Sequence, residues 1–300
     1  MEFITKPNFL IGVIVTVGTL LAGPVRAEAA ENASLRTNPI LTDRWLIWAG
    51  GFFPSLDSRL RMDSDMGSPG SGLDFEDELG LSENKTVLWG GARWRMARRH
   101  QLEIEFNNLR RSGFNGFTLE DYQIGDQRVD AGGSIATTFN VFLARLTYGY
   151  SLIKDEKQDL ALKAGFHFTN VDASLQLAGD VTNVDTGMSL CSPAPCISPL
   201  LETSEFTFPL PHFGLAYAYA FTPKFALRAQ GLAFYIVIND IKGALYELDF
   251  DLHYQPWKKF GLGAGFRYFR MSVDDKRDKL FRGKFIFEYW GPVIYASVSF

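Results

Sequence analysis

The chain has 300 residues, of which 46% are hydrophobic and 14% aromatic, and its formal net charge at pH 7 is −4. This acidic balance argues against nucleic acid as a partner, because nucleic-acid-binding domains carry a basic patch. The one strongly hydrophobic run, Phe9–Ala22, is shorter than the roughly 20 apolar residues that a transmembrane helix needs. The length allows one large barrel or two ordinary domains.

Residues 1–27 have the features of a secretory signal peptide. Lys6 precedes the hydrophobic run, and the small residue Ala27 follows it after Val25 and Arg26. We predict cleavage after Ala27, with Ala29 as the second choice. The mature chain that begins after Ala27 has a formal net charge of about −5. Residues 28–43 show no clear period and are predicted to form a short periplasmic lead to a barrel over residues 44–300.

The rest of the chain repeats the alternation of apolar and polar side chains that is typical of strands with two unlike faces. The pattern is clearest in Ala244–Pro256, where a helix would scatter the same residues around its circumference. The first predicted strand is Trp45–Asp63, with a bend or bulge at Gly50, Gly51 and Pro54. The others, in chain order, are Thr86–Ala97, a strand through Leu102–Asn107, a strand that ends with Asn140–Leu152, Leu160–Thr169, Glu205–Phe221, Phe225–Ile238, Ala244–Pro256, Phe260–Tyr268 and a last strand that ends at Phe300.

The connections between these strands alternate in length. The first, third and fifth are long and the second, fourth and sixth are tight, as in barrels with long outer loops and short periplasmic turns. Aromatic residues gather beside the predicted periplasmic turns, as an interfacial girdle would: Trp94, Tyr148, Tyr150, Tyr217, Tyr219, Phe221, Tyr254 and Trp257. We therefore predict an all-β, transmembrane, antiparallel up-and-down β-barrel of about ten strands, with eight or twelve as alternatives.

The chain ends IYASVSF, with Phe300 last and Ile294, Ala296 and Val298 on the same strand face. This ending resembles the signature of Gram-negative outer-membrane barrels, in which a terminal aromatic residue is recognised by the barrel-assembly machinery. LDFEDELGL at Leu73–Leu81, RWRMARRHQLEIEFNNLRRSG at Arg93–Gly113 and YWGPVIYASVSF at Tyr289–Phe300 also resemble a family of uncharacterised proteobacterial outer-membrane barrels. The resemblance implies an outer-membrane location, with outer-membrane lipid and lipopolysaccharide as partners, and brings no known activity.

Two cysteines, Cys191 and Cys196, lie close together in one long loop. In an oxidising compartment such a pair is expected to form a disulfide. A pair of metal ligands is the alternative, but no histidine or further cysteine accompanies them.

The residues predicted to face the interior are mostly charged: Arg93, Arg95, Glu103, Glu105, Arg145, Lys163, His167, Arg228, Glu247, Asp249, Asp251, His253 and Arg267. If the second connection turns near Arg98–Arg99, Arg95 faces Glu103 and Arg93 faces Glu105. Such charges could fill the interior as ion pairs or line a channel. We favour a filled interior, because side chains just fill an eight-stranded barrel and ten strands add little room.

Two acidic clusters are candidate sites. Glu247, Asp249, Asp251 and His253 lie two residues apart on one strand, about 6.6–6.8 Å from one to the next, which is too far to share one metal without other strands. The first outer loop contains six acidic residues, whose oxygens are ligands of the kind that calcium prefers: Asp63, Asp65, Asp74, Glu76, Asp77 and Glu78. The loop lacks a complete calcium-loop pattern. We predict no catalytic residue, metal or cofactor.

Three functions fit these observations. The first is a structural or surface-interaction barrel, the second is a narrow diffusion channel for small solutes, and the third is a membrane-embedded hydrolase. We rank the first slightly above the second, because about ten strands enclose little space and the inward charged side chains are long. The hydrolase comes last, because no serine–histidine spacing in the sequence matches a lipase or deacylase pattern. The sequence leaves the oligomeric state open.

Overall fold

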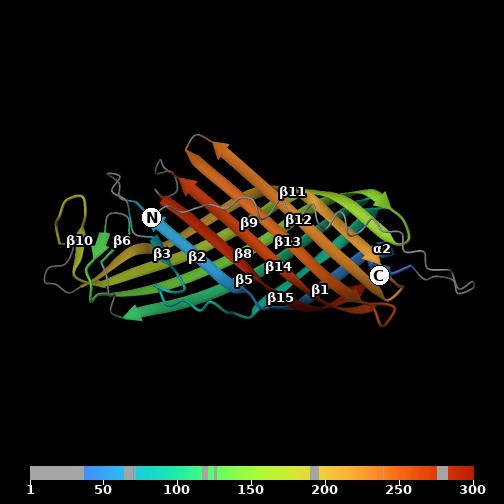
Figure 1. Ribbon diagram of the computed structural model, residues 1–300, viewed down its shortest axis with the longest axis horizontal. Coiled ribbons are helices and arrows are strands. Elements are labelled where there is room, and N and C mark those ends of the chain that lie inside the picture. The colour runs from blue at the N-terminus through green and yellow to red at the C-terminus, as the bar shows by residue number, and fades with distance from the viewer. Residues whose placement is uncertain are drawn as a thin grey trace, which may run out of the picture. The chain divides into compact units, whose positions relative to one another are not determined.

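Figure 1 shows the computed structural model, which describes residues 37–63, 70, 72–116, 121–124, 127–189, 196–238, 240–275 and 283–300. They belong to one compact unit, residues 36–300. The predicted signal peptide and Cys191 lie outside the described residues, so cleavage after Ala27 and the Cys191–Cys196 disulfide stay predictions. No helix within the described ranges is long and apolar enough to cross a membrane.

The fold is a closed antiparallel barrel in which each strand pairs with its neighbours in the chain and the last strand returns to the first. The strands are β1 (Trp45–Phe52), β2 (Ser55–Met62), β4 (Val87–Ala97), β5 (His100–Gly116), β8 (Ser134–Lys154), β9 (Gln158–Gly179), β11 (Cys196–Ala220), β12 (Phe225–Ile238), β13 (Ile241–Tyr254), β14 (Phe260–Asp275) and β15 (Gly283–Ser299). β1 and β2 both pair with β15 and together form one staggered strand, which makes ten. The prediction of about ten strands is confirmed.

The interruption between β1 and β2 lies at Phe53 and Pro54. Proline has no N–H to donate to the next strand, so it marks a break in the hydrogen-bond ladder. The N–H of Phe53 still donates to the Pro292 carbonyl of β15 over 3.0 Å, which keeps the first and last strands together across the break. At the end of the chain, the backbones of Trp45 and Phe300 exchange two hydrogen bonds of 2.8 and 3.0 Å. The role of Phe300 as an assembly signal stays a prediction.

The remaining elements lie at the two ends of the barrel. β3 (Gly72–Asp74) pairs with β2. β6 (Tyr122–Ile124), β7 (Gln127–Val129) and β10 (Val181–Asn183) form a separate small sheet. The short helix α2 (Pro39–Thr42) lies at the opposite end from β6 and β10, beside the C-terminus (Figure 1). That end carries the short turns, which makes it the periplasmic end of a barrel of this type.

On β8 and its two neighbours, the outer face of the barrel changes from apolar to polar along the strand. On β8, alternate side chains from Phe142 to Leu152 form the apolar part of the outer face, and the polar part begins at Asn140. Asn108 of β5 and Asn170 of β9 lie opposite Phe142 and begin the polar part of their own strands. The apolar part of β8 therefore matches the roughly 9–11 residues with which a tilted strand crosses a bilayer.

The predicted pairing between β4 and β5 is wrong by two residues. Arg93 lies opposite Glu103, and Arg95 lies opposite Gln101. Part of the difference is an irregularity between Arg95 and Ala97, beside the tight turn, where the pairing shifts by one residue. The alternation cannot exclude the predicted pairing, because a slip of two residues keeps every side chain on the same face. The turn itself lies at Arg98 and Arg99, as predicted, so only the pairing beyond it differs.

We expect the purified protein to show a sheet-dominated circular dichroism spectrum and to migrate faster on a detergent gel before boiling than after it. The reason is that the closed barrel keeps every strand paired, so that it stays compact until heat separates the strands. A helical spectrum, or the same mobility before and after boiling, would contradict the fold.

Candidate functional site: the interior of the barrel

The middle of the barrel is crossed by a network of buried ion pairs centred on Arg145 of β8. This guanidinium donates to Glu103 over 3.0 Å, to Glu105 over 3.1 Å and to Asp249 over 3.4 Å, and it also contacts Glu247. Glu103 and Glu105 come from β5, whereas Glu247 and Asp249 come from β13, which is on the far side of the barrel in strand order. Arg145 therefore links opposite walls.

Arg267 of β14 forms a second link between the same two strands. Its guanidinium donates to Glu105 over 2.5 Å and to both Glu247 and Asp249 over 2.9 Å. Lys163 of β9 adds an ion pair of 3.2 Å to Glu103, and His167 contacts Glu247 over 2.8 Å. We call these eight residues the central network: Glu103, Glu105, Arg145, Lys163, His167, Glu247, Asp249 and Arg267.

The other predicted interior residues also have buried or half-buried side chains, but they bind elsewhere. Arg228 donates to Asp251 over 2.9 Å and to the hydroxyl of Tyr295 over 2.8 Å. His253 contacts the hydroxyl of Ser297 over 2.8 Å. Arg93 and Arg95 do not pair with Glu105 and Glu103 as predicted. Arg93 donates to the Ile40 carbonyl, and Arg95 donates to Asp159 over 3.1 Å.

The small residues of β14 are covered by large side chains of neighbouring strands. A Cβ atom at Gly263 would overlap the ring of Tyr295, and one at Gly261 would overlap His253 and Ser297. Glycine is therefore required at these two positions, because the neighbouring side chains occupy the space that a Cβ atom would need. Arg228 lies over two interior rings as well, 5.8 Å from the centre of Trp48 and 5.5 Å from that of Tyr295.

The periplasmic end of the interior is closed by α2. Its residues Ile40 and Leu41 are almost completely buried. Arg93 donates to the Ile40 carbonyl over 2.5 Å, and Lys154 donates to the Leu41 carbonyl over 2.5 Å. At the same end of the barrel, the side chain of Asn38 donates to the Thr222 carbonyl in the β11–β12 turn over 3.3 Å. The predicted lead therefore includes a segment that lies inside the barrel and not only before it.

Replacing the anchors of α2 is expected to release it. In the double variant Arg93→Met, Lys154→Met, the Leu41 carbonyl loses its donor and the Ile40 carbonyl keeps only the 3.5 Å contact from Arg95. We expect limited proteolysis to cleave within residues 38–43 at least ten-fold faster than in the wild type. This factor corresponds to about 1.4 kcal/mol of protection, which is less than two hydrogen bonds to charged groups are worth together. Lys224→Met, an exposed turn lysine, is the control. Equal cleavage rates in all three proteins would show that these contacts do not hold α2.

The outer half of the interior is an apolar core built partly from the first outer loop. Leu73, Phe75, Leu79 and Leu81 of this loop are buried inside the barrel. Phe75 meets Phe139 of β8 edge to face at 5.0 Å between ring centres. Further rings of this core come from three strands, β1, β14 and β15: Phe52, Phe269, Phe285, Phe287 and Tyr289. This core closes the outer end above the central network.

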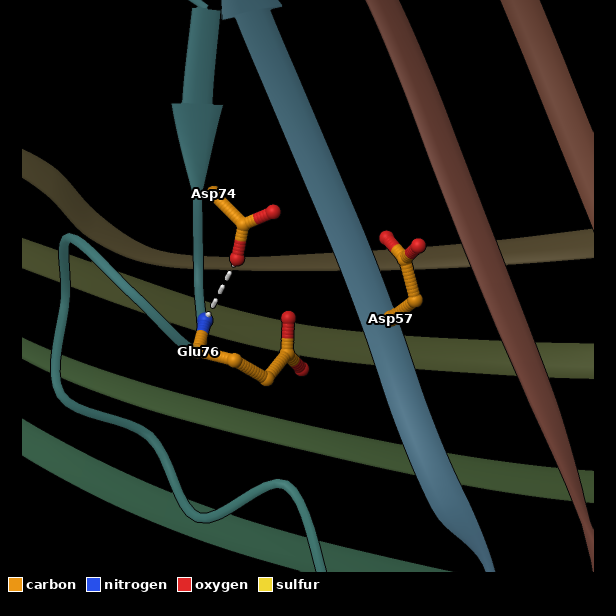
Figure 2. Close-up of side chains that lie close together, drawn as sticks. All are labelled: Asp57, Asp74 and Glu76. Atoms are coloured by element: carbon orange, nitrogen blue, oxygen red, sulfur yellow. Dashed lines mark hydrogen bonds between the residues drawn. The ribbon is translucent and has the colours of Figure 1, made fainter.

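Three carboxylates lie close together where this loop leaves the wall. Figure 2 shows Asp57 on β2, Asp74 at the end of β3 and Glu76 between them, and one oxygen from each lies within 4.8 Å of the others. Arg59 pairs with Asp57 over 2.8 Å and with Asp74 over 3.4 Å, while Arg111 and the N–H of Ser58 bind the two oxygens of Glu76. Burial raises the pKa of Glu76, against the effect of these two donors. Each of the three carboxylates therefore has an arginine partner within the protein. Asp65, another acidic residue of the first outer loop, lies outside the described residues.

A small cavity remains beside the central network. It has a volume of about 80 Å³ and is lined by Trp48, Trp89, Glu103, Lys163, Arg228 and Asp251, among others. A water molecule needs roughly 10–15 Å³ of such volume, so the cavity has room for only a few waters. It lies between the two closed ends of the barrel.

Comparison with known proteins gives the fold. No family model matches the chain, and no curated protein sequence matches it. Among solved structures, the outer membrane protease OmpT from Escherichia coli superposes with a TM-score of 0.51 at 13% identity, over 91% of this chain and 100% of that chain. The fold is that of a Gram-negative outer-membrane β-barrel.

Two other outer-membrane barrels superpose less well. The toluene transporter TodX from Pseudomonas putida has a TM-score of 0.35 at 10% identity, over 91% of this chain and 95% of that chain. The attachment invasion locus protein Ail from Yersinia pestis has a TM-score of 0.31 at 12% identity, over 86% of this chain and 99% of that chain. At these TM-scores and identities, the two superpositions carry no conclusion about this chain.

Proposed function

We propose that the chain is an integral outer-membrane barrel with a filled interior and a structural or surface-interaction role, without enzymatic activity. The observation that carries this proposal is the central network, in which Arg145 and Arg267 link β5 to β13 across the barrel. The network lies between α2 at one end and the apolar core at the other. The apolar outer face of the strands supports the membrane location.

The energetics of the interior argue against the alternative of a diffusion channel. A channel needs a continuous aqueous path, and such a path would have to separate Arg145 and Arg267 from their carboxylates as well as displace the two closed ends. Breaking one buried ion pair by removing a partner costs about 3–5 kcal/mol. Thermal fluctuations therefore open the interior too rarely to support steady flux.

The buried histidines support the absence of catalysis. His253 and Ser297 form a serine–histidine contact, but the side chain of His253 is fully buried and no group in the described part of the chain bonds its Nδ1 atom. A catalytic triad needs an acid at that atom to orient the ring and a substrate path to the serine. Its neighbour Gly261, against which His253 packs, leaves no space for a substrate.

Two assays on one preparation test the proposal. Liposomes that contain the protein should swell in isosmotic sugar no faster than empty liposomes, and a mixture of peptides should stay intact after prolonged incubation with them. A swelling rate that rises with the amount of protein would favour the channel. Peptide cleavage that is lost in Ser297→Ala would establish an enzyme.

A further inference from the structure

An apolar groove lies on the outer face of the barrel where β1, β15 and β14 run side by side. Its volume is about 650 Å³, within the range of roughly 300–1,000 Å³ that is usual for ligand pockets. Ala49 and Ala296, which lie opposite each other on β1 and β15, form its floor. Ile47, Leu262 and Phe260 stand up around the floor, each with about half of its surface exposed.

The groove belongs to the part of the barrel that faces lipid. Ala49 and Ala296 have exposed side chains, whereas their neighbours Trp48 and Ser297 point inward and are buried. Trp257, in the turn between β13 and β14, borders the groove at its periplasmic end and is 63% exposed. Tryptophan in such a position marks the level of the lipid headgroups.

Positive charge lies at the same end. Lys258 and Lys259 follow Trp257 directly, both are exposed, and neither forms an ion pair within the part of the chain that the structure describes. They belong to a periplasmic rim in which exposed bases outnumber acids, with the bases Arg44, Arg98, Arg99, Lys157, Lys224, Lys258 and Lys259 against Asp43, Asp155 and Glu156. A groove for a hydrocarbon chain therefore ends beside two unpaired cations.

We propose that this groove binds one anionic phospholipid of the periplasmic leaflet. An acyl chain lies over Ala49 and Ala296, and the headgroup phosphate binds Lys258 and Lys259 beside Trp257. The inference rests on the proposed membrane location. Charge selects this ligand over a second copy of the chain, because a symmetric pair of barrels in one membrane would bring the same lysines of both copies together.

Native mass spectrometry of the protein extracted from bilayers with equal amounts of phosphatidylglycerol and phosphatidylcholine, with identical acyl chains, tests the site. The wild type should retain phosphatidylglycerol in preference. Each basic residue near an anionic surface contributes about 1 kcal/mol to binding, which is about five-fold in affinity. The double variant Lys258→Ala, Lys259→Ala should therefore lower the preference for phosphatidylglycerol over phosphatidylcholine about 25-fold. Lys157→Ala, Lys224→Ala, which removes two rim cations away from the groove, should keep it. Ala296→Phe fills the groove and should abolish retention of both lipids.

Equal retention of the two lipids by the wild type would overturn the proposal, as would the same loss in both double-lysine variants. A dimer mass that Ala296→Phe removes would assign the groove to a second copy instead. All proteins are first checked for insertion and for heat-modifiable mobility. A chain that fails to insert contradicts the proposed membrane location, whereas an inserted chain without lipid preference contradicts only the lipid site.

Discussion

Arg145→Met is expected to lower the free energy of unfolding of the barrel by about 3–5 kcal/mol, because it removes one partner from a buried ionic network. Arg145 contacts four carboxylates, of Glu103, Glu105, Glu247 and Asp249, and its side chain is 5% exposed. Methionine fills a similar volume and carries no charge, so the carboxylates stay buried with fewer donors. Urea unfolding of the protein in lipid vesicles, followed by tryptophan fluorescence, measures the change.

Two further variants show that the loss comes from the network. Arg59→Met removes an arginine whose side chain is 52% exposed and whose ion pairs lie at the surface, so it should cost no more than about 1 kcal/mol. The double variant Arg145→Met, Glu247→Met should be more stable than Arg145→Met alone. In the single variant four buried carboxylates share Arg267, Lys163 and His167, and removing Glu247 lowers this excess of negative charge. If Arg145→Met stays within about 1 kcal/mol of the wild type, the network does not carry the stability that we assign to it.

Phe139→Ala should also cost about 3–5 kcal/mol, the usual range for removing a buried phenylalanine. Its ring lies 5.0 Å from Phe75 of the inward loop and 6.0 Å from both Phe285 and Phe287. Because Phe75 loses its edge-to-face partner, the first outer loop should become more open to proteolysis. The same unfolding titration measures the loss of stability, and mass spectrometry of the digest locates the cleavage.

Phe142→Ala is the matched control for Phe139→Ala, because it changes the same residue type on the same strand. Phe142 points outward and is 43% exposed, so lipid fills the space that its ring leaves. We expect a smaller loss of stability and no change in loop cleavage. Equal effects of the two substitutions would mean that the loop does not pack on the inner face of β8.

The alternation of side chains was enough to predict which residues point inward, because it depends only on neighbours along one strand. Arg145 and Glu247 were both placed in the interior on this basis. That they meet could not be predicted, because their contact joins residues 102 positions apart and depends on the tilt and register of the strands between them. The wrong pairing of Arg93 with Glu105 has a related origin, since alternation fixes the face of each residue but does not distinguish registers that differ by two residues.

The two closed ends lay beyond the strand pattern, although each has a signal in the sequence. α2 is too short to show a helical period, but Asn38 before Pro39 is typical of a helix start, and the Asn38 side chain accepts a hydrogen bond from Ile40. In the first outer loop, Leu73, Phe75, Leu79 and Leu81 are apolar within a strongly acidic segment. Apolar residues spaced through an acidic loop indicate a segment that folds back onto a core.

Single-channel recording in a planar bilayer is the most direct test of the filled interior. The wild-type barrel should give no stable conductance steps, because the central network and both closed ends block an aqueous path. Steady ohmic conductance of the wild type, changed in size or ion selectivity by Arg145→Ala or Asp249→Ala, would contradict the account and show that the interior is a channel.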